Sequence, residues 1–84
     1  MKVNFIGLGY IGLPTAIIAA KHGIEIAGTD INPDIVEATN QGHLHIVEPD
    51  MEDMLREVVA NGKLKAYTEP QLSDAYFIVV PTPF

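Results

Sequence analysis

The 84-residue sequence has no cysteine and few basic side chains, and both absences limit what it can do. Without cysteine, these residues form no disulfide framework, no thiolate metal site and no cysteine nucleophile. Five Lys and Arg residues against eleven Asp and Glu residues give a formal net charge of −6. A protein that binds the phosphate backbone of a nucleic acid needs a basic face, so this balance argues against a nucleic-acid partner.

The sequence also lacks an uninterrupted hydrophobic run long enough to cross a membrane. Residues 3–20 are nearly uncharged, but three glycines and Pro14 interrupt them, and the first apolar run is only as long as a strand. We therefore expect no membrane partner and a cytoplasmic location. Hydrophobic residues make up 48% of the chain, which is too many for a disordered protein and enough for the core of one small domain.

Short apolar runs alternate along the chain with segments of helical periodicity. The expected strands are 2–6, 24–29, 64–68 and 76–80, and the expected helices cover about 11–22, 33–40 and 50–61. Pro33 and Pro49 stand where helices begin, which is where proline is tolerated. Strands that alternate with helices form a parallel sheet through right-handed crossovers. The predicted fold class is α/β, half of a doubly wound parallel sheet of about four strands in the order 3-2-1-4, truncated before the second half.

A glycine-rich turn joins the first expected strand to the first expected helix. It reads GLGYIG, the pattern G-x-G-x-x-G, which is weak alone and much stronger between a strand and a helix. Gly7 allows the tight turn, Gly9 lets a pyrophosphate approach the backbone, and Gly12 lets the helix pack closely on the sheet. The free N–H groups near Tyr10 and Ile11 would then face the phosphates, with the helix dipole behind them.

An acidic residue stands at the end of the second expected strand. Asp30 follows the glycine turn at the spacing, roughly twenty residues, where a carboxylate accepts hydrogen bonds from the adenosine ribose hydroxyls. Because a carboxylate repels a 2′-phosphate, NAD is favoured over NADP as the cofactor. The alternative is that the glycines merely shape a strand-to-helix turn and that Asp30 caps the next turn.

Four short motifs stand out along the chain, and two words within them, GYIGLP and PTP, are far more specific than the glycine pattern. The four motifs are IGLGYIGLP at 6–14, TDIN at 29–32, VEP at 47–49 and VPTP at 80–83. With these motifs the whole chain resembles the start of the UDP-glucose/GDP-mannose dehydrogenase family. This resemblance implies a partial Rossmann fold. The run HIVEPD at 45–50 and the ending VPTPF at 80–84 are most similar to the branch of the family that acts on UDP-N-acetyl-D-mannosamine.

The resemblance implies a reaction and a set of cofactor contacts. The family oxidises the C6 primary alcohol of a nucleotide sugar to a carboxylate in two NAD-dependent steps, linked by a cysteine thiohemiacetal. Its NAD contacts would fall on Tyr10, Ile11 and Asp30, with Thr82 beside the cofactor after the fourth strand. Ile35 is a departure, because some relatives carry Lys or Arg there. With the glycines, the expected cofactor-binding residues are Gly7, Gly9, Tyr10, Ile11, Gly12, Asp30 and Thr82.

The resemblance also implies that residues 1–84 are the amino-terminal part of a dinucleotide-binding domain in a longer enzyme. The family's catalytic cysteine, its general-base and oxyanion groups and its sugar-binding domain lie beyond the equivalent of Phe84, so we expect no turnover from these residues alone. The fourth expected strand is apolar and has one uncovered edge, which is a pairing hazard. We therefore expect self-association through this edge in the fragment, and a homo-oligomer with NAD and a UDP-sugar as ligands in the parent enzyme.

Other interpretations of the same residues remain. A non-catalytic module that senses NAD or a related adenine nucleotide would share the glycine turn and Asp30, as would half of a flavoprotein or methyltransferase domain. The Pro-Thr-Pro ending and the helix start at Pro49 favour the enzyme.

His43 and His45, with Glu48 close by, imitate a metal site but offer no third ligand at a recurrent spacing, so we expect no metal.

Overall fold

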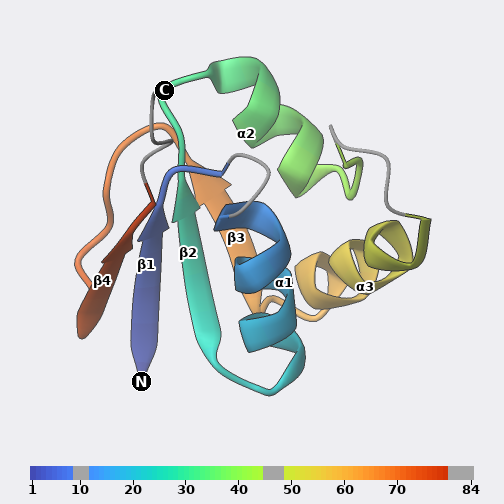
Figure 1. Ribbon diagram of the computed structural model, residues 1–84, viewed down its shortest axis with the longest axis horizontal. Coiled ribbons are helices and arrows are strands. Elements are labelled where there is room, and N and C mark those ends of the chain that lie inside the picture. The colour runs from blue at the N-terminus through green and yellow to red at the C-terminus, as the bar shows by residue number, and fades with distance from the viewer. Residues whose placement is uncertain (9–11, 45–48, 80–84) are drawn as a thin grey trace, which may run out of the picture.

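A four-stranded parallel sheet forms the centre of the computed structural model, which describes residues 1–8, 12–44 and 49–79 (Figure 1). The strands are β1 (Lys2–Ile6), β2 (Glu25–Thr29), β3 (Leu64–Tyr67) and β4 (Ala75–Ile78), and the helices are α1 (Gly12–Lys21), α2 (Pro33–Asn40) and α3 (Pro49–Ala60). The strands lie in the order β3-β2-β1-β4, with every neighbouring pair parallel. This arrangement confirms the predicted fold class and strand order.

The helix boundaries follow from capping residues that the sequence makes visible. Helix α2 begins at Pro33, and the side chain of Asn32 caps it by accepting a hydrogen bond of 2.9 Å from the Asp34 N–H. Its C-cap is Gln41. Gly42 comes one residue later with a φ of +79°, because the left-handed residue of such a helix end lies just outside the helix.

The hydrophobic core lies between the sheet and the two helices α1 and α3, which cover the same face of it (Figure 1). Each helix turns one apolar side toward this core, as its spacing of apolar residues requires. The buried members from the two helices are Leu13, Ala16, Ile17, Ala20, Leu55 and Val58. Among the described residues, no helix combines the length and the apolar character that a membrane span needs.

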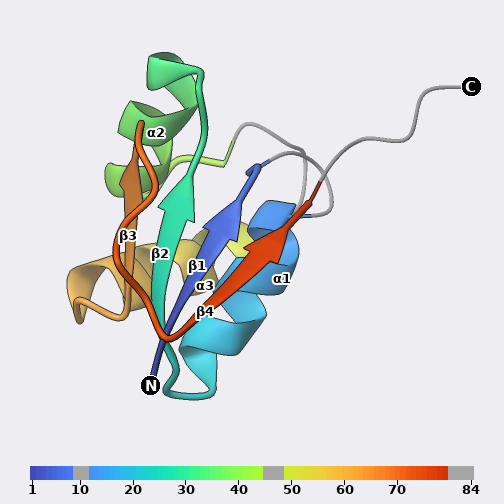
Figure 2. The ribbon, with the colours of Figure 1, turned by 90° about the vertical axis from the view of Figure 1, so that its left-hand side faces the viewer.

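The opposite face of the sheet is crossed by the connection from β3 to β4 (Figure 2). The buried side chain of Asn4 in β1 holds this connection, since its Oδ1 accepts a hydrogen bond of 2.8 Å from the Gln71 N–H. Its Nδ2 donates to the Ala27 carbonyl and to Thr29 Oγ1 in β2, both at 2.9 Å. A buried amide with all these partners costs little, and it places the connection so that β4 returns beside β1.

The two edges of the sheet differ in how they are covered. At the β3 edge, the side chain of Asn40 pairs with both the N–H and the carbonyl of Ala66, at 2.8 and 3.0 Å. At the other edge, β4 pairs with β1 alone within the described part of the chain. Tyr76, Phe77 and Ile78 are 47%, 57% and 67% exposed there. The uncovered edge expected for the fourth strand is therefore present, although Val80 lies outside the described residues.

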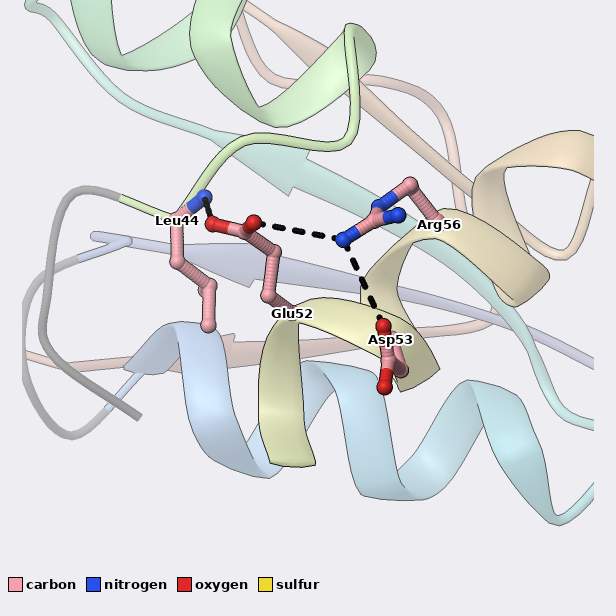
Figure 3. A network of polar contacts seen from close by, with 4 residues as sticks. All are labelled: Leu44, Glu52, Asp53 and Arg56. Carbon is pink, nitrogen blue, oxygen red and sulfur yellow. Dashed lines mark hydrogen bonds and ion pairs between the residues drawn. The ribbon is translucent and has the colours of Figure 1, made fainter. Parts of the chain in front are cut away.

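The connection between α2 and α3 is attached to α3 by a small polar network (Figure 3). The carboxylate of Glu52 accepts hydrogen bonds of 3.3 Å from the Leu44 N–H and from Arg56 Nη2. Arg56 also lies 3.3 Å from Asp53 Oδ1. Exposed ion pairs of this kind contribute little stability, and the attachment of the connection to α3 is the hydrogen bond from Leu44 to Glu52. His45 and Glu48 of the rejected metal set follow in residues 45–48, outside the described part.

Candidate functional site

The candidate site is a cleft of about 170 Å³ at the carboxyl ends of three strands. It is lined by residues 6–7 at the end of β1, residues 29–31 at the end of β2 and residues 78–79 at the end of β4. Because β2 and β4 lie on opposite sides of β1, the sheet reverses its winding order at this point. Open α/β sheets bind their ligands outside the carboxyl ends of the strands at such a switch point.

Gly7 turns the chain out of β1 inside this cleft. Its φ is +102°, a left-handed conformation that glycine adopts without strain. Its N–H donates a hydrogen bond of 2.7 Å to the Thr29 carbonyl. A Cβ at this position would collide with the carbonyl oxygen of Val79. The turn therefore requires glycine for two independent reasons, as the sequence predicts.

Gly12 begins α1 and lies directly against the same turn. A Cβ on Gly12 would collide with the carbonyl oxygen of Gly7 and would lie 3.6 Å from the Cβ of Val79. The sequence predicts a close approach between helix and sheet at this glycine. The nearest groups are in fact the Gly7 carbonyl and the residue after β4, so Gly12 allows α1 to start close to the turn itself.

Asp30 follows β2, and two backbone N–H groups orient its carboxylate. Oδ2 accepts a hydrogen bond of 3.0 Å from the Leu8 N–H, and Oδ1 accepts one of 2.9 Å from the Asn32 N–H. The bond to Asn32 is the turn-capping role, the alternative function of an acid at this position. The bond to Leu8 was not predicted. Since each carboxylate oxygen has two lone pairs, Asp30 keeps the capacity to accept further hydrogen bonds in the cleft.

Leu8 is a residue of the site that sequence reasoning missed. Its side chain is fully buried, and it lies over Gly28 of β2, where an added Cβ would come within 2.9 Å of Leu8 Cδ2. The leucine side chain therefore fills the space that Gly28 leaves free and attaches the turn to β2. A glycine inside an expected strand often marks such a close approach, and this was the signal available in the sequence.

The structure brings together those predicted cofactor-binding residues that it describes. Gly7 and Asp30 line the cleft, and Gly12 lies against Gly7. The other predicted residues, which are Gly9, Tyr10, Ile11 and Thr82, lie outside the described residues. Ile35, the departure from the basic residue of some relatives, is half-buried in α2 and packs against the core.

None of the five basic side chains of the protein lines the cleft. Lys21 pairs with Glu57 at 3.0 Å on the outside of the helices, and Arg56 pairs with the acids of α3. Lys65 lies over the ring of Tyr67, 5.6 Å from its centroid. A phosphate in the cleft would therefore depend on backbone N–H groups rather than on a basic side chain.

A second cleft, of about 330 Å³, lies beside the outer edge of β3. It is lined by Asn40, Val59, Gly62, Leu64 and Lys65. The Asn40 amide already pairs with Ala66, and the cleft is remote from the carboxyl ends of the strands where ligands bind in such sheets. The described residues contain no group of three His, Asp or Glu side chains that could hold a metal ion. The first cleft is therefore the candidate.

The parallel sheet, the strand order and the glycine turn define a Rossmann-type α/β segment. Residues 1–84 match the family model described as the UDP-glucose/GDP-mannose dehydrogenase family, NAD binding domain. The chain belongs to this family, which makes NAD the cofactor that its fold is built to hold.

Individual relatives are similar along the whole chain. It is 51% identical over 82 residues to the NDP-N-acetyl-D-galactosaminuronic acid dehydrogenase of Ralstonia nicotianae, covering 98% of this chain and 19% of that protein. It is 54% identical over 83 residues to the UDP-N-acetyl-D-mannosamine dehydrogenase of Campylobacter jejuni, covering 99% and 20%. The solved UDP-N-acetyl-mannosamine dehydrogenase of Staphylococcus aureus is 46% identical with a TM-score of 0.94, covering 99% and 20%. The chain thus spans about one fifth of these relatives.

Two glycine variants separate the crowding at the cleft from ordinary backbone strain. Gly23 also has a positive φ, +95°, but nothing lies within 4 Å of the position of its Cβ. Gly23→Ala should therefore lower the free energy of unfolding by about 1–2 kcal/mol, the cost of the left-handed conformation. Gly7→Ala should cost at least about 1 kcal/mol more, because the Val79 backbone must also move. Urea unfolding measures both, and equal losses would contradict the close contact at Gly7.

Proposed function

We propose that the chain binds NAD in the cleft at the carboxyl ends of β1, β2 and β4. The observation that carries this proposal is the Asp30 carboxylate, which two N–H bonds orient beside a turn that only glycine can form. The adenosine ribose would donate its hydroxyl groups to Asp30, and the pyrophosphate would lie along residues 7–12. The bound nicotinamide would supply the hydride acceptor for oxidation of a substrate.

The same carboxylate supports NAD rather than NADP as the ligand. A 2′-phosphate on the ribose would lie close to the negative charge of Asp30, and the cleft has no lysine or arginine to neutralise it. Repulsion between like charges in a partly buried site is costly. We therefore propose that the protein discriminates strongly against NADP.

We also propose that residues 1–84 are the amino-terminal part of the dinucleotide-binding domain of a nucleotide-sugar 6-dehydrogenase. The chain spans about one fifth of relatives that are named as dehydrogenases, and it contains no cysteine to form a thiohemiacetal. The catalytic and sugar-binding groups would then lie outside these residues.

The proposed substrate of the parent enzyme is UDP-N-acetyl-D-mannosamine or a related UDP-sugar, oxidised to its uronic acid in two NAD-dependent steps. Relatives named for N-acetyl-D-mannosamine and for N-acetyl-D-galactosaminuronic acid are similarly identical, at 54% and 51%. They share an N-acetylated hexose on a nucleotide, so this class is supported more firmly than any single sugar. With a nucleotide-sugar substrate, we further propose that the parent enzyme works in the cytoplasm, in polysaccharide biosynthesis.

Replacing Asp30 tests the ribose assignment. Asp30→Ala should weaken NAD binding by about 1.5–3 kcal/mol, the value of hydrogen bonds to a charged group, and it should narrow the preference for NAD over NADP. The matched control is Asp34→Ala, which removes an equal charge from the exposed first turn of α2 and should leave the dissociation constant nearly unchanged. Isothermal titration calorimetry measures both. An unchanged NAD affinity in the Asp30 variant would overturn the assignment.

We further propose that the open edge of β4 is an interface. The Asn40 side chain occupies the backbone groups of Ala66 at the β3 edge, whereas β4 has three large exposed apolar side chains and no neighbour on one side among the described residues. Exposed apolar edges pair with other chains. The 84-residue chain would therefore self-associate there, and in the parent enzyme, which we propose is a homo-oligomer, further chain or another subunit would cover it.

A charge on the β4 edge tests this interface. Ile78→Lys places a positive charge on the edge strand, which is how natural proteins block edge pairing, so it should shift the chain toward monomer. The control is Leu72→Lys, at a side chain that is 91% exposed but lies on the connection before β4. Sedimentation velocity over a concentration series should show association of the wild type and of the control only. A wild-type chain that stays monomeric at high concentration would contradict the interface.

A further inference from the structure

We propose that Asp30 is also a positioning residue, which holds the glycine turn in its ligand-binding geometry through the Leu8 N–H. The adenosine-ribose and pyrophosphate subsites would then be coupled through one carboxylate, although they belong to different strand ends. The inference rests on the NAD site proposed above. It goes further by assigning to Asp30 an indirect effect on phosphate binding, which acts through the Leu8 N–H rather than through a contact between Asp30 and the phosphate.

The beginning of the turn is attached at three points to β2 and to Asp30, the residue that follows β2. The Gly7 N–H donates to the Thr29 carbonyl at 2.7 Å, and the Leu8 N–H donates to Asp30 Oδ2 at 3.0 Å. The buried Leu8 side chain lies over Gly28. Only the second of these attachments uses a charged side chain, and hydrogen bonds to an ionised acceptor are roughly twice as strong as neutral ones.

The hydrogen-bonding capacity of the carboxylate allows both roles at once. Each oxygen of Asp30 accepts one backbone N–H, from Leu8 and from Asn32, and each retains one acceptor position for a ribose hydroxyl. The two N–H groups fix the orientation of the carboxylate before a ligand arrives. A ligand then does not have to order this side chain, which is the physical basis of preorganised binding.

The lack of basic side chains at the cleft makes the geometry of the turn decisive. Among the described residues that line it there is no lysine or arginine, so the attraction that this part of the chain offers a phosphate comes from backbone N–H groups of the turn. Such groups act only over hydrogen-bonding distance and in a suitable direction. A turn that loses its attachment to Asp30 should therefore lose affinity for phosphate. This expected loss is opposite in sign to the direct charge effect, because removing the negative carboxylate would by itself favour phosphate binding.

The test compares adenosine with ADP as ligands of the full chain. Both carry the ribose, so loss of a ribose contact cancels in the ratio of their dissociation constants, whereas a change in the turn alters this ratio. Asp30→Ala should reduce the preference for ADP by roughly fivefold, the scale of one net hydrogen bond. Leu8→Ala, which keeps the carboxylate and removes the attachment over Gly28, should reduce it in the same direction. Asp34→Ala, which removes an equal charge from the exposed first turn of α2 outside the cleft, should leave it unchanged.

A second measurement needs no ligand. Hydrogen exchange of the Leu8 amide, followed by NMR in the free protein, should accelerate at least about tenfold in Asp30→Ala, while the amide of Phe5 in β1 should stay protected if the variant is folded. A ratio of ADP to adenosine affinity that is unchanged in Asp30→Ala, or unchanged Leu8 exchange in the folded variant, would overturn the coupling alone. A wild-type protein that binds neither NAD nor ADP would overturn the proposed function and the coupling with it.

Discussion

The close approach of three backbones around Gly7 is the constraint on which the rest of the site depends. The chain leaves β1 at Gly7, between β2 and β4. The Gly7 N–H bonds to the Thr29 carbonyl, and the Val79 carbonyl lies where a Cβ of residue 7 would be. No residue with a side chain fits this position without moving the backbone of Val79. Because the turn stays this close to β2, the Leu8 N–H reaches Asp30. Because the Gly7 carbonyl lies against Gly12, α1 can begin there only with a glycine. The cleft is what remains between these fixed groups.

The position of β4 is the second requirement of the cleft, and a buried polar residue that does not itself line the cleft, Asn4, secures it. Val79 forms one wall, and it comes into place only if the connection from β3 crosses behind β1. Asn4 holds this connection through the Gln71 N–H while its amide group bonds to β2. A buried, fully satisfied amide of this kind specifies one arrangement, since any other would leave polar groups without partners. The site thus depends on contacts between segments about seventy positions apart in the sequence.

Local signals were enough to predict the elements, and tertiary proximity was needed for the contacts between them. Asn32 followed by Pro33 marks the start of α2, because helix capping depends on neighbouring residues only. The alternation of apolar runs with helical segments likewise predicts a parallel sheet with right-handed crossovers. The bond between Asp30 and Leu8, the role of Asn4 and the pairing of Asn40 with Ala66 could not be predicted, because each joins separate elements and leaves no periodic trace. Gly28 is intermediate: a glycine inside a strand indicates a close neighbour but does not identify Leu8.

The most direct test of the account is a titration of the isotopically labelled protein with NAD, followed by the backbone amide signals in NMR. The account predicts that the largest changes occur at Gly7, Leu8, Asp30 and Ile31, the residues around the cleft at the strand ends. Amides near Asn40 and Lys65, beside the second cleft, should change little. Changes concentrated at the second cleft, or no changes at saturating NAD, would contradict the assignment of the first cleft as the cofactor site.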